Sequence, residues 1–182
     1  MHALQSVIKN QPSFRHILYG ALSVAALIIS AKLQVPLWPV PMTLQSLVVI
    51  ALPFLVGPAC GFASVVAYLG LGLMGVPVFA GLGAGLPYVM GPTGGYLVGF
   101  LLAASLAQMA AHSSQRKFLP ALAVFMVGHI VIVAAGFAWL VWGLGFMQLA
   151  QALMVAVMPF IVGSILKSFL GATIVYLWHT RT

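Results

Sequence analysis

The chain contains neither aspartate nor glutamate, and this absence restricts what it can fold into more than any other feature. None of its seven Lys and Arg residues can form an ion pair with a side-chain carboxylate of the same chain. Charged residues make up 4% of the 182 positions and hydrophobic residues 63%, whereas a soluble domain carries about 25% charged residues. A surface so poor in charge cannot cover a water-soluble protein, so we expect an integral membrane protein.

The apolar residues form runs that Pro, Gly or polar residues separate. A membrane-spanning helix needs about 20 apolar residues, so the length suits six spans with short loops. We predict an all-α membrane protein, a bundle of six transmembrane helices in a single domain, 1–182. The expected spans are 17–33, 44–56, 62–75, 96–111, 118–142 and 152–178. The first run is interpreted as a retained span, because further apolar runs follow it and no convincing cleavage site does.

The basic residues predict how the bundle is oriented. With six spans, the N-terminal segment 1–15, the loop near 112–117 and the C-terminus lie on one side, and five of the seven basic residues fall there. Because positive residues favour the inner side of a membrane, we expect an N-in, C-in topology with a cytoplasmic 1–15 segment. The proline-rich segment 35–43 and the glycine-rich segment 76–95 then lie outside. Irregular backbone at membrane depth must be buried in protein or line a cavity, so we expect both segments to form an outward-facing pocket.

Lys167 lies inside the last apolar run, where a charge at a helix centre costs roughly 2.5–3.5 kcal/mol. An ionisable residue within the membrane is a candidate functional residue. Three interpretations stay open: contact with an acceptor group of a ligand, pairing with backbone carbonyls, or extension of the side chain to the interface. Lys32 ends the first run, where we expect an interfacial role or the attraction of an anion.

Two long motifs carry a family resemblance. Residues 30–47, SAKLQVPLWPVPMTLQSL, and 91–100, GPTGGYLVGF, resemble the signatures of BioY, the biotin-binding S component of energy-coupling-factor transporters. The resemblance extends to 73–81, to Gly128 with His129, and to 159–167. It implies a multi-pass subunit of a bacterial-type plasma membrane that captures biotin from outside. It also implies a transmembrane coupling subunit and two ATPase subunits as partners, and no enzymatic activity, cofactor or metal. The chain departs from the family at Ser164, where an Asp is usual.

Candidate ligand-binding residues are the polar, aromatic and glycine residues of the two outer segments and of the last span. They are Lys167, Ser164, Gln45, Thr43, Tyr88, Tyr96, Gly83 and Gly85. Each type has a structural explanation as well: a helix cap for Thr43, a hydrogen bond to its own helix for Ser164, and turn geometry for the glycines. His129 is expected to hydrogen-bond between helices rather than to contact the ligand.

The small residues Ala21 and Ala25 allow another helix to approach closely, and with the resemblance they predict the docking surface for the coupling subunit. Because no carboxylate can hold Mg²⁺, a self-contained nucleotide hydrolase is not expected, and uphill transport would draw its energy from a partner. Three alternatives remain: the same architecture with another small ligand, an intramembrane hydrolase using Ser164 and His129, and a small-molecule channel.

Overall fold

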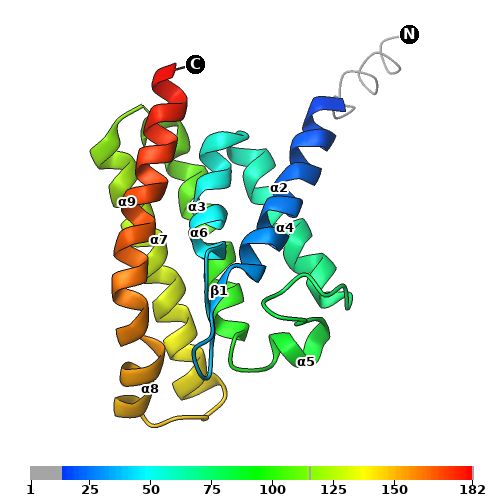
Figure 1. Ribbon diagram of the computed structural model, residues 1–182, viewed down its shortest axis with the longest axis vertical. Coiled ribbons are helices and arrows are strands. Elements are labelled where there is room, and N and C mark those ends of the chain that lie inside the picture. The colour runs from blue at the N-terminus through cyan, green and yellow to red at the C-terminus, as the bar shows by residue number, and fades with distance from the viewer. Residues whose placement is uncertain (1–13, 115, 182) are drawn as a thin grey trace.

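The computed structural model describes residues 14–114 and 116–181, and its regular structure is almost entirely helical, as predicted (Figure 1). Most of the predicted N-terminal segment 1–15 lies outside the described residues. The helices are α2 (Phe14–Lys32), α3 (Gln45–Leu55), α4 (Pro58–Leu73), α5 (Gly85–Val89), α6 (Gly94–Ser114), α7 (Phe118–Ala138), the π-helical turn η1 (Trp139–Gly143), α8 (Leu149–Ala156) and α9 (Met158–Arg181).

Within residues 14–114 and 116–181, three helical stretches are long and apolar enough to cross a membrane. They are α6, α7 continued by η1, and α8 continued by α9. The helix α3 has only 11 residues, which at 1.5 Å per residue rise about 16 Å, roughly half the thickness of a bilayer core. The expected count of six spans and the membrane orientation therefore stay predictions.

The last predicted span, 152–178, is not one continuous helix. It is divided between α8 and α9, which meet at Val157. Pro159 is the second residue of α9 and has no N–H to donate to the preceding turn, so the hydrogen-bond ladder is interrupted at this point.

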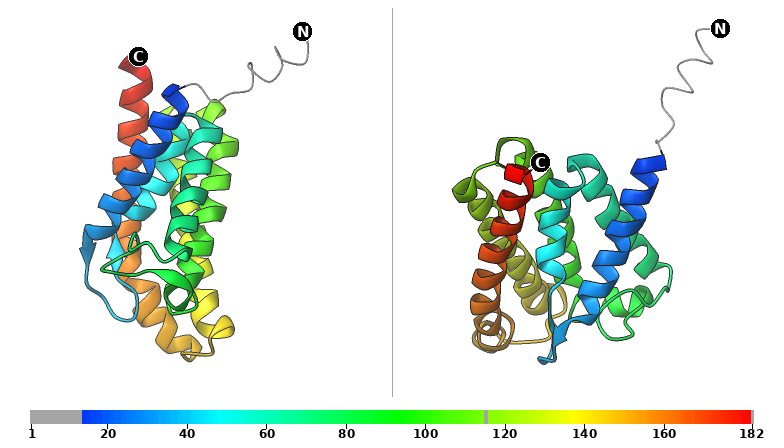
Figure 2. Two further views of the ribbon diagram at one scale, coloured as in Figure 1. Left: turned by 90° about the vertical axis from the view of Figure 1, so that its right-hand side faces the viewer. Right: turned by 45° about the horizontal axis from the view of Figure 1, so that its top comes forward.

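The two segments expected to be irregular are more ordered than predicted. Residues 34–43 form a hairpin in which β1 (Gln34–Val35) pairs antiparallel with β2 (Met42–Thr43). The segment 76–95 contains α5 and the first two residues of α6. Figures 1 and 2 show the hairpin, α5 and α8 together at one end of the bundle. The first residues of α2 and the last residues of α9 lie at the opposite end.

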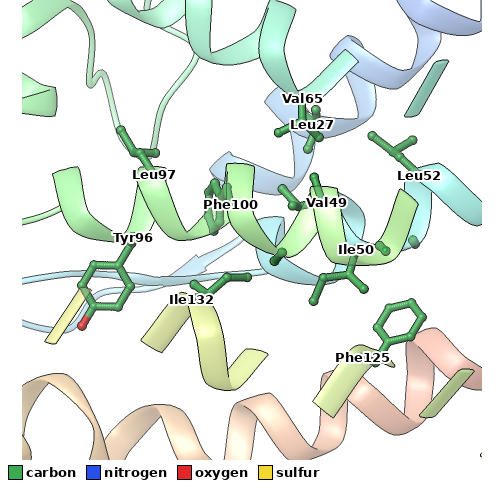
Figure 3. Packing of buried hydrophobic residues seen from close by; sticks show 14 of the residues in the cluster. Leu27, Val49, Ile50, Leu52, Val65, Tyr96, Leu97, Phe100, Phe125 and Ile132 are labelled. Atoms are coloured by element: carbon green, nitrogen blue, oxygen red, sulfur yellow. The ribbon is translucent and has the colours of Figure 1, made fainter. Parts of the chain in front are cut away.

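The core is built around α6, whose inner face is made of small residues. Ala103, Ala104 and Ala107 are fully buried, so neighbouring backbones approach closely. Toward the hairpin end the core side chains of α6 become larger, and Figure 3 shows the ring of Tyr96 on the side of α6 that faces Ile132 of α7. The outward faces are apolar, as expected of helices that contact lipid: Ile29 of α2 is 63% exposed.

Candidate functional site

A cavity lies between α3, α6, α7 and α9, beneath the hairpin and the segment 76–95. The space between its lining residues is about 520 Å³, open solvent at the mouth included. Six of the eight predicted ligand-binding residues line it: Lys167, Ser164, Gln45, Thr43, Tyr88 and Tyr96. The predicted pocket is therefore present, and residues from distant parts of the chain meet in it.

Lys167 is held against the hairpin by hydrogen bonds rather than by a counter-charge. Its Nζ donates to the backbone carbonyl of Thr43 at 3.0 Å and to Ser46 Oγ at 3.0 Å. One helical turn earlier, a Cβ on Gly163 would overlap the sulfur of Met42, so glycine lets the hairpin lie directly on α9. An ammonium has three N–H donors, and the described residues accept two of them. The pairing with a carbonyl is present, and one donor remains for an acceptor in the cavity.

A chain of hydrogen bonds joins α3 to the outer segment. The buried Gln45 donates from Nε2 to the hydroxyl of Tyr68 at 2.6 Å, and that hydroxyl donates to the carbonyl of Val78 at 3.0 Å. The Thr43 hydroxyl accepts the backbone N–H of Gln45 at 3.3 Å, although Leu44 rather than Thr43 is the residue at the helix cap. Sequence reasoning missed Tyr68; the signal was a tyrosine within an apolar helix, whose hydroxyl needs a partner when buried.

The two predicted tyrosines have different surroundings. Tyr88 of α5 stacks on Phe79 with ring centroids 5.1 Å apart, and burial raises the pKa of its hydroxyl above the ordinary value. Tyr96 stacks on Phe160 at 5.5 Å and donates its hydroxyl to the carbonyl of Ala156 at 2.9 Å. The Tyr96 hydroxyl thus connects α6 to α8. Its side chain also lines the cavity.

Gly83 and Gly85 do not line the cavity. A Cβ on Gly83 would overlap the ring of Tyr88, and Gly85 adopts a φ of 74°, which L-residues with side chains rarely take. Both glycines shape the loop on which Tyr88 is carried. Their predicted backbone contact with a ligand stays untested.

A hydrogen bond between His129 and Ser168 joins α7 to α9. His129 is 2% exposed, and its Nδ1 lies 2.9 Å from the carbonyl of Phe125 and 3.0 Å from Ser168 Oγ. The Ser168 hydroxyl donates to the carbonyl of Ser164 at 2.8 Å. The interhelical hydrogen bond expected of His129 is present, and Ser168, which the sequence did not single out, supplies it. Among the described residues, the Ser164 hydroxyl itself makes no hydrogen bond.

Lys32 makes specific hydrogen bonds in addition to the interfacial position predicted for it. Its Nζ donates to the carbonyls of Pro77, Phe79 and Gly81, at 3.0, 2.8 and 2.7 Å. All three N–H donors of the ammonium therefore hold the outer segment against the end of α2. Lys32 does not line the cavity, but it fixes the segment that carries Tyr88.

The predicted docking residues Ala21 and Ala25 are both exposed on α2, on a face that includes the 58%-exposed Leu22. Within residues 14–114 and 116–181, no group of three or more His or Cys residues lies close enough together to hold a metal ion.

Comparison with known proteins agrees with the resemblance in the motifs. The sequence profile of the BioY family matches residues 5–182. A probable biotin transporter BioY of Pyrococcus horikoshii is 38% identical over 148 residues, which cover 81% of this chain and 86% of that protein. The biotin transporter BioY of Thermotoga maritima is 33% identical over 162 residues, covering 88% of this chain and 93% of that protein.

The fold also resembles a crystal structure of the S-component for biotin from an ECF-type ABC transporter. The two structures superpose with a TM-score of 0.79 at 29% sequence identity, over 92% of each chain. Motifs, sequence profile and fold agree over nearly the whole length, and the chain is a member of the BioY family.

Proposed function

We propose that this chain is the biotin-binding S component of an energy-coupling-factor transporter. The observation that carries the proposal is one cavity, in a member of the BioY family, that is lined by Lys167, Gln45, Thr43 and Ser164 together with two tyrosines. The relatives in Pyrococcus horikoshii and Thermotoga maritima bear the name biotin transporter, and the similar solved structure is an S-component for biotin.

The chemistry of the cavity suits this ligand. Biotin has a carboxylate, a ureido group and an apolar bicyclic ring. The free N–H of Lys167 can donate to the carboxylate or to the ureido carbonyl, and such charge-assisted hydrogen bonds are the stronger kind. Gln45 offers an amide next to it, and the rings of Tyr88 and Tyr96 offer flat surfaces for the bicycle. With no acid in the chain, nothing repels an anionic ligand.

The proposal includes the arrangement in the membrane and the partners. The bundle crosses the plasma membrane six times, with both termini in the cytoplasm and with the hairpin and α5 facing outward. A transmembrane coupling subunit and two ATPase subunits supply the energy, and the coupling subunit docks on α2 at Ala21 and Ala25. The protein itself binds and delivers biotin and catalyses no reaction.

The test is direct binding to the purified protein in lipid nanodiscs. Isothermal titration with biotin is expected to show saturable binding at one site, while thiamine, riboflavin and pantothenate show none. No saturable binding at up to millimolar biotin would refute the proposal. Saturable binding of another vitamin instead would support the alternative that Ser164 motivates, the same architecture with a different ligand.

A separate measurement addresses the hydrolase alternative. Ser164 and His129 would have to act as nucleophile and base, yet the serine that is hydrogen-bonded to His129 is Ser168. A fluorophosphonate probe is therefore expected to leave the protein unlabelled. Labelling of Ser164 would favour the hydrolase over the transporter subunit.

A further inference from the structure

His129 carries a buried acceptor that its own helix does not use. The carbonyl of Phe125, 2.9 Å from Nδ1, can only accept, so Nδ1 must carry the proton. The single hydroxyl proton of Ser168 is directed to the carbonyl of Ser164, which leaves Ser168 Oγ as a second acceptor for Nδ1–H. In the neutral ring Nε2 is then a hydrogen-bond acceptor. It is buried, and within residues 14–114 and 116–181 it has no partner.

The position of Nε2 shows where a partner can come from. His129, Val133 and Ser164 form a wall between the ligand cavity and a groove on the outside of α7 and α9. Apart from His129 and Ser164, the groove is lined by apolar side chains such as Ile130, Phe137 and Ile161, which offer no donor. Apart from the Ser164 hydroxyl, which lines both spaces, a donor for Nε2 must therefore come from the cavity side, where the other polar residues lie.

We infer that His129 contacts the ligand, and that its Nε2 accepts a hydrogen bond from a ureido N–H of biotin. This inference rests on the proposed function. Ser164 lines the same wall from the facing helix, and among the described residues its backbone carbonyl, not its hydroxyl, is the group bonded to Ser168, so the hydroxyl is available to the same polar group. In a chain without carboxylates, a neutral imidazole is a strong acceptor available for such an N–H. His129 and Ser164 together then select ligands that carry a ureido N–H, because a ligand whose ureido nitrogen is substituted leaves Nε2 without a hydrogen-bond donor.

Two substitutions separate a ligand contact from a purely structural role. In His129→Asn the side-chain amide can replace Nδ1–H toward Phe125 but does not reach the position of Nε2. In His129→Gln the longer side chain places an amide oxygen near Nε2 and gives up the contact of Nδ1. A ligand contact predicts that the Asn variant loses affinity and that the Gln variant keeps it. A role confined to joining α7 and α9 predicts the reverse.

The measurement is the dissociation constant of biotin and of two analogues, each methylated at one ureido nitrogen, for the protein in nanodiscs. The unmodified protein is expected to bind one methylated analogue at least tenfold more weakly than biotin. His129→Asn is expected to bind biotin about tenfold more weakly and that analogue almost unchanged, so the discrimination disappears. Val133→Ala alters the same wall without removing an acceptor, and is expected to shift both ligands by the same factor.

The inference is overturned if His129→Asn binds biotin as tightly as the unmodified protein, or if it weakens both ligands equally. It is also overturned if His129→Gln alone loses the discrimination. These outcomes differ from failure of the proposed function, in which the unmodified protein would not bind biotin at all.

Discussion

Replacing Lys167 by Met tests whether the buried lysine contacts the ligand. The substitution removes the ammonium and keeps a flexible apolar chain of similar length. A hydrogen bond from a charged donor is worth about 1.5–3 kcal/mol, and each 1.4 kcal/mol is tenfold in a dissociation constant. Biotin is therefore expected to bind roughly ten- to a hundredfold more weakly to Lys167→Met in isothermal titration.

The stability of the same variant is expected to change little. The substitution removes two charge-assisted hydrogen bonds of the ammonium, to the carbonyl of Thr43 and to Ser46 Oγ, which together stabilise the fold by about 3–6 kcal/mol. Removing the charge from the membrane interior regains roughly 2.5–3.5 kcal/mol. These contributions largely offset each other, so the midpoint of thermal unfolding, followed by tryptophan fluorescence, is expected to fall by only a few degrees.

Leu166→Met is the matched control, because Leu166 precedes the lysine on α9 and is 65% exposed on the outer face of the bundle. It introduces the same residue into the same helix away from the cavity and is expected to bind biotin normally. If Lys167→Met binds biotin within twofold of the unmodified protein, the lysine is a structural residue. If Lys167→Met loses affinity and its unfolding midpoint also falls strongly, the loss of affinity results from release of the hairpin and not from a lost ligand contact.

Three further substitutions test other parts of the structure. Tyr68→Phe removes the hydroxyl that accepts from Gln45 and should lower the free energy of unfolding by about 1–3 kcal/mol; an unchanged urea midpoint would contradict this. Gly163→Ala places a methyl group against the sulfur of Met42 and should cost about 1–3 kcal/mol, and adding Met42→Ala should restore stability if that overlap is the cause. Ala21→Leu should leave biotin binding unchanged but reduce biotin uptake in cells that carry the coupling subunits; normal uptake would place the docking surface elsewhere.

The apolar runs were sufficient to predict most of the longer helices, because polar, proline-rich or glycine-rich residues separate the runs, but the five-residue α5 lies in a segment that was expected to be irregular. The predicted start of the fifth span at Phe118 coincides with the start of α7, directly after a basic loop. The division of the last span at Val157 was missed, because the composition there is as apolar as in an unbroken helix. Pro159 was the available signal, but proline is tolerated in the first turn of a helix and does not show whether a second helix precedes it.

The cavity residues were predictable where a polar side chain interrupts an apolar run, as at Lys167 and Gln45. Their partners were not, because the pairing depends on how distant segments come together. The lysine at position 167 donates to a carbonyl 124 residues earlier in the chain. Likewise, Lys32 donates to carbonyls 45 to 49 residues later. A sequence shows that a donor needs an acceptor, but any backbone carbonyl can serve, and carbonyls are the same at every position.

The absence of acids explains why Lys167, inside the last apolar run, and Lys32, at the end of the first, take the same kind of partner. With no carboxylate available, each ammonium is stabilised by oxygen dipoles, and the available dipoles are those of irregular backbone, whose carbonyls are not used in a helix ladder. Lys32 binds three carbonyls of the segment 76–95, and Lys167 binds one carbonyl of the hairpin together with a serine hydroxyl. The two cations therefore fasten the two segments that cover the cavity. Lys32 has used all its donors, whereas Lys167 retains one, so a ligand that enters can add an acceptor to Lys167 without first breaking its hold on the hairpin.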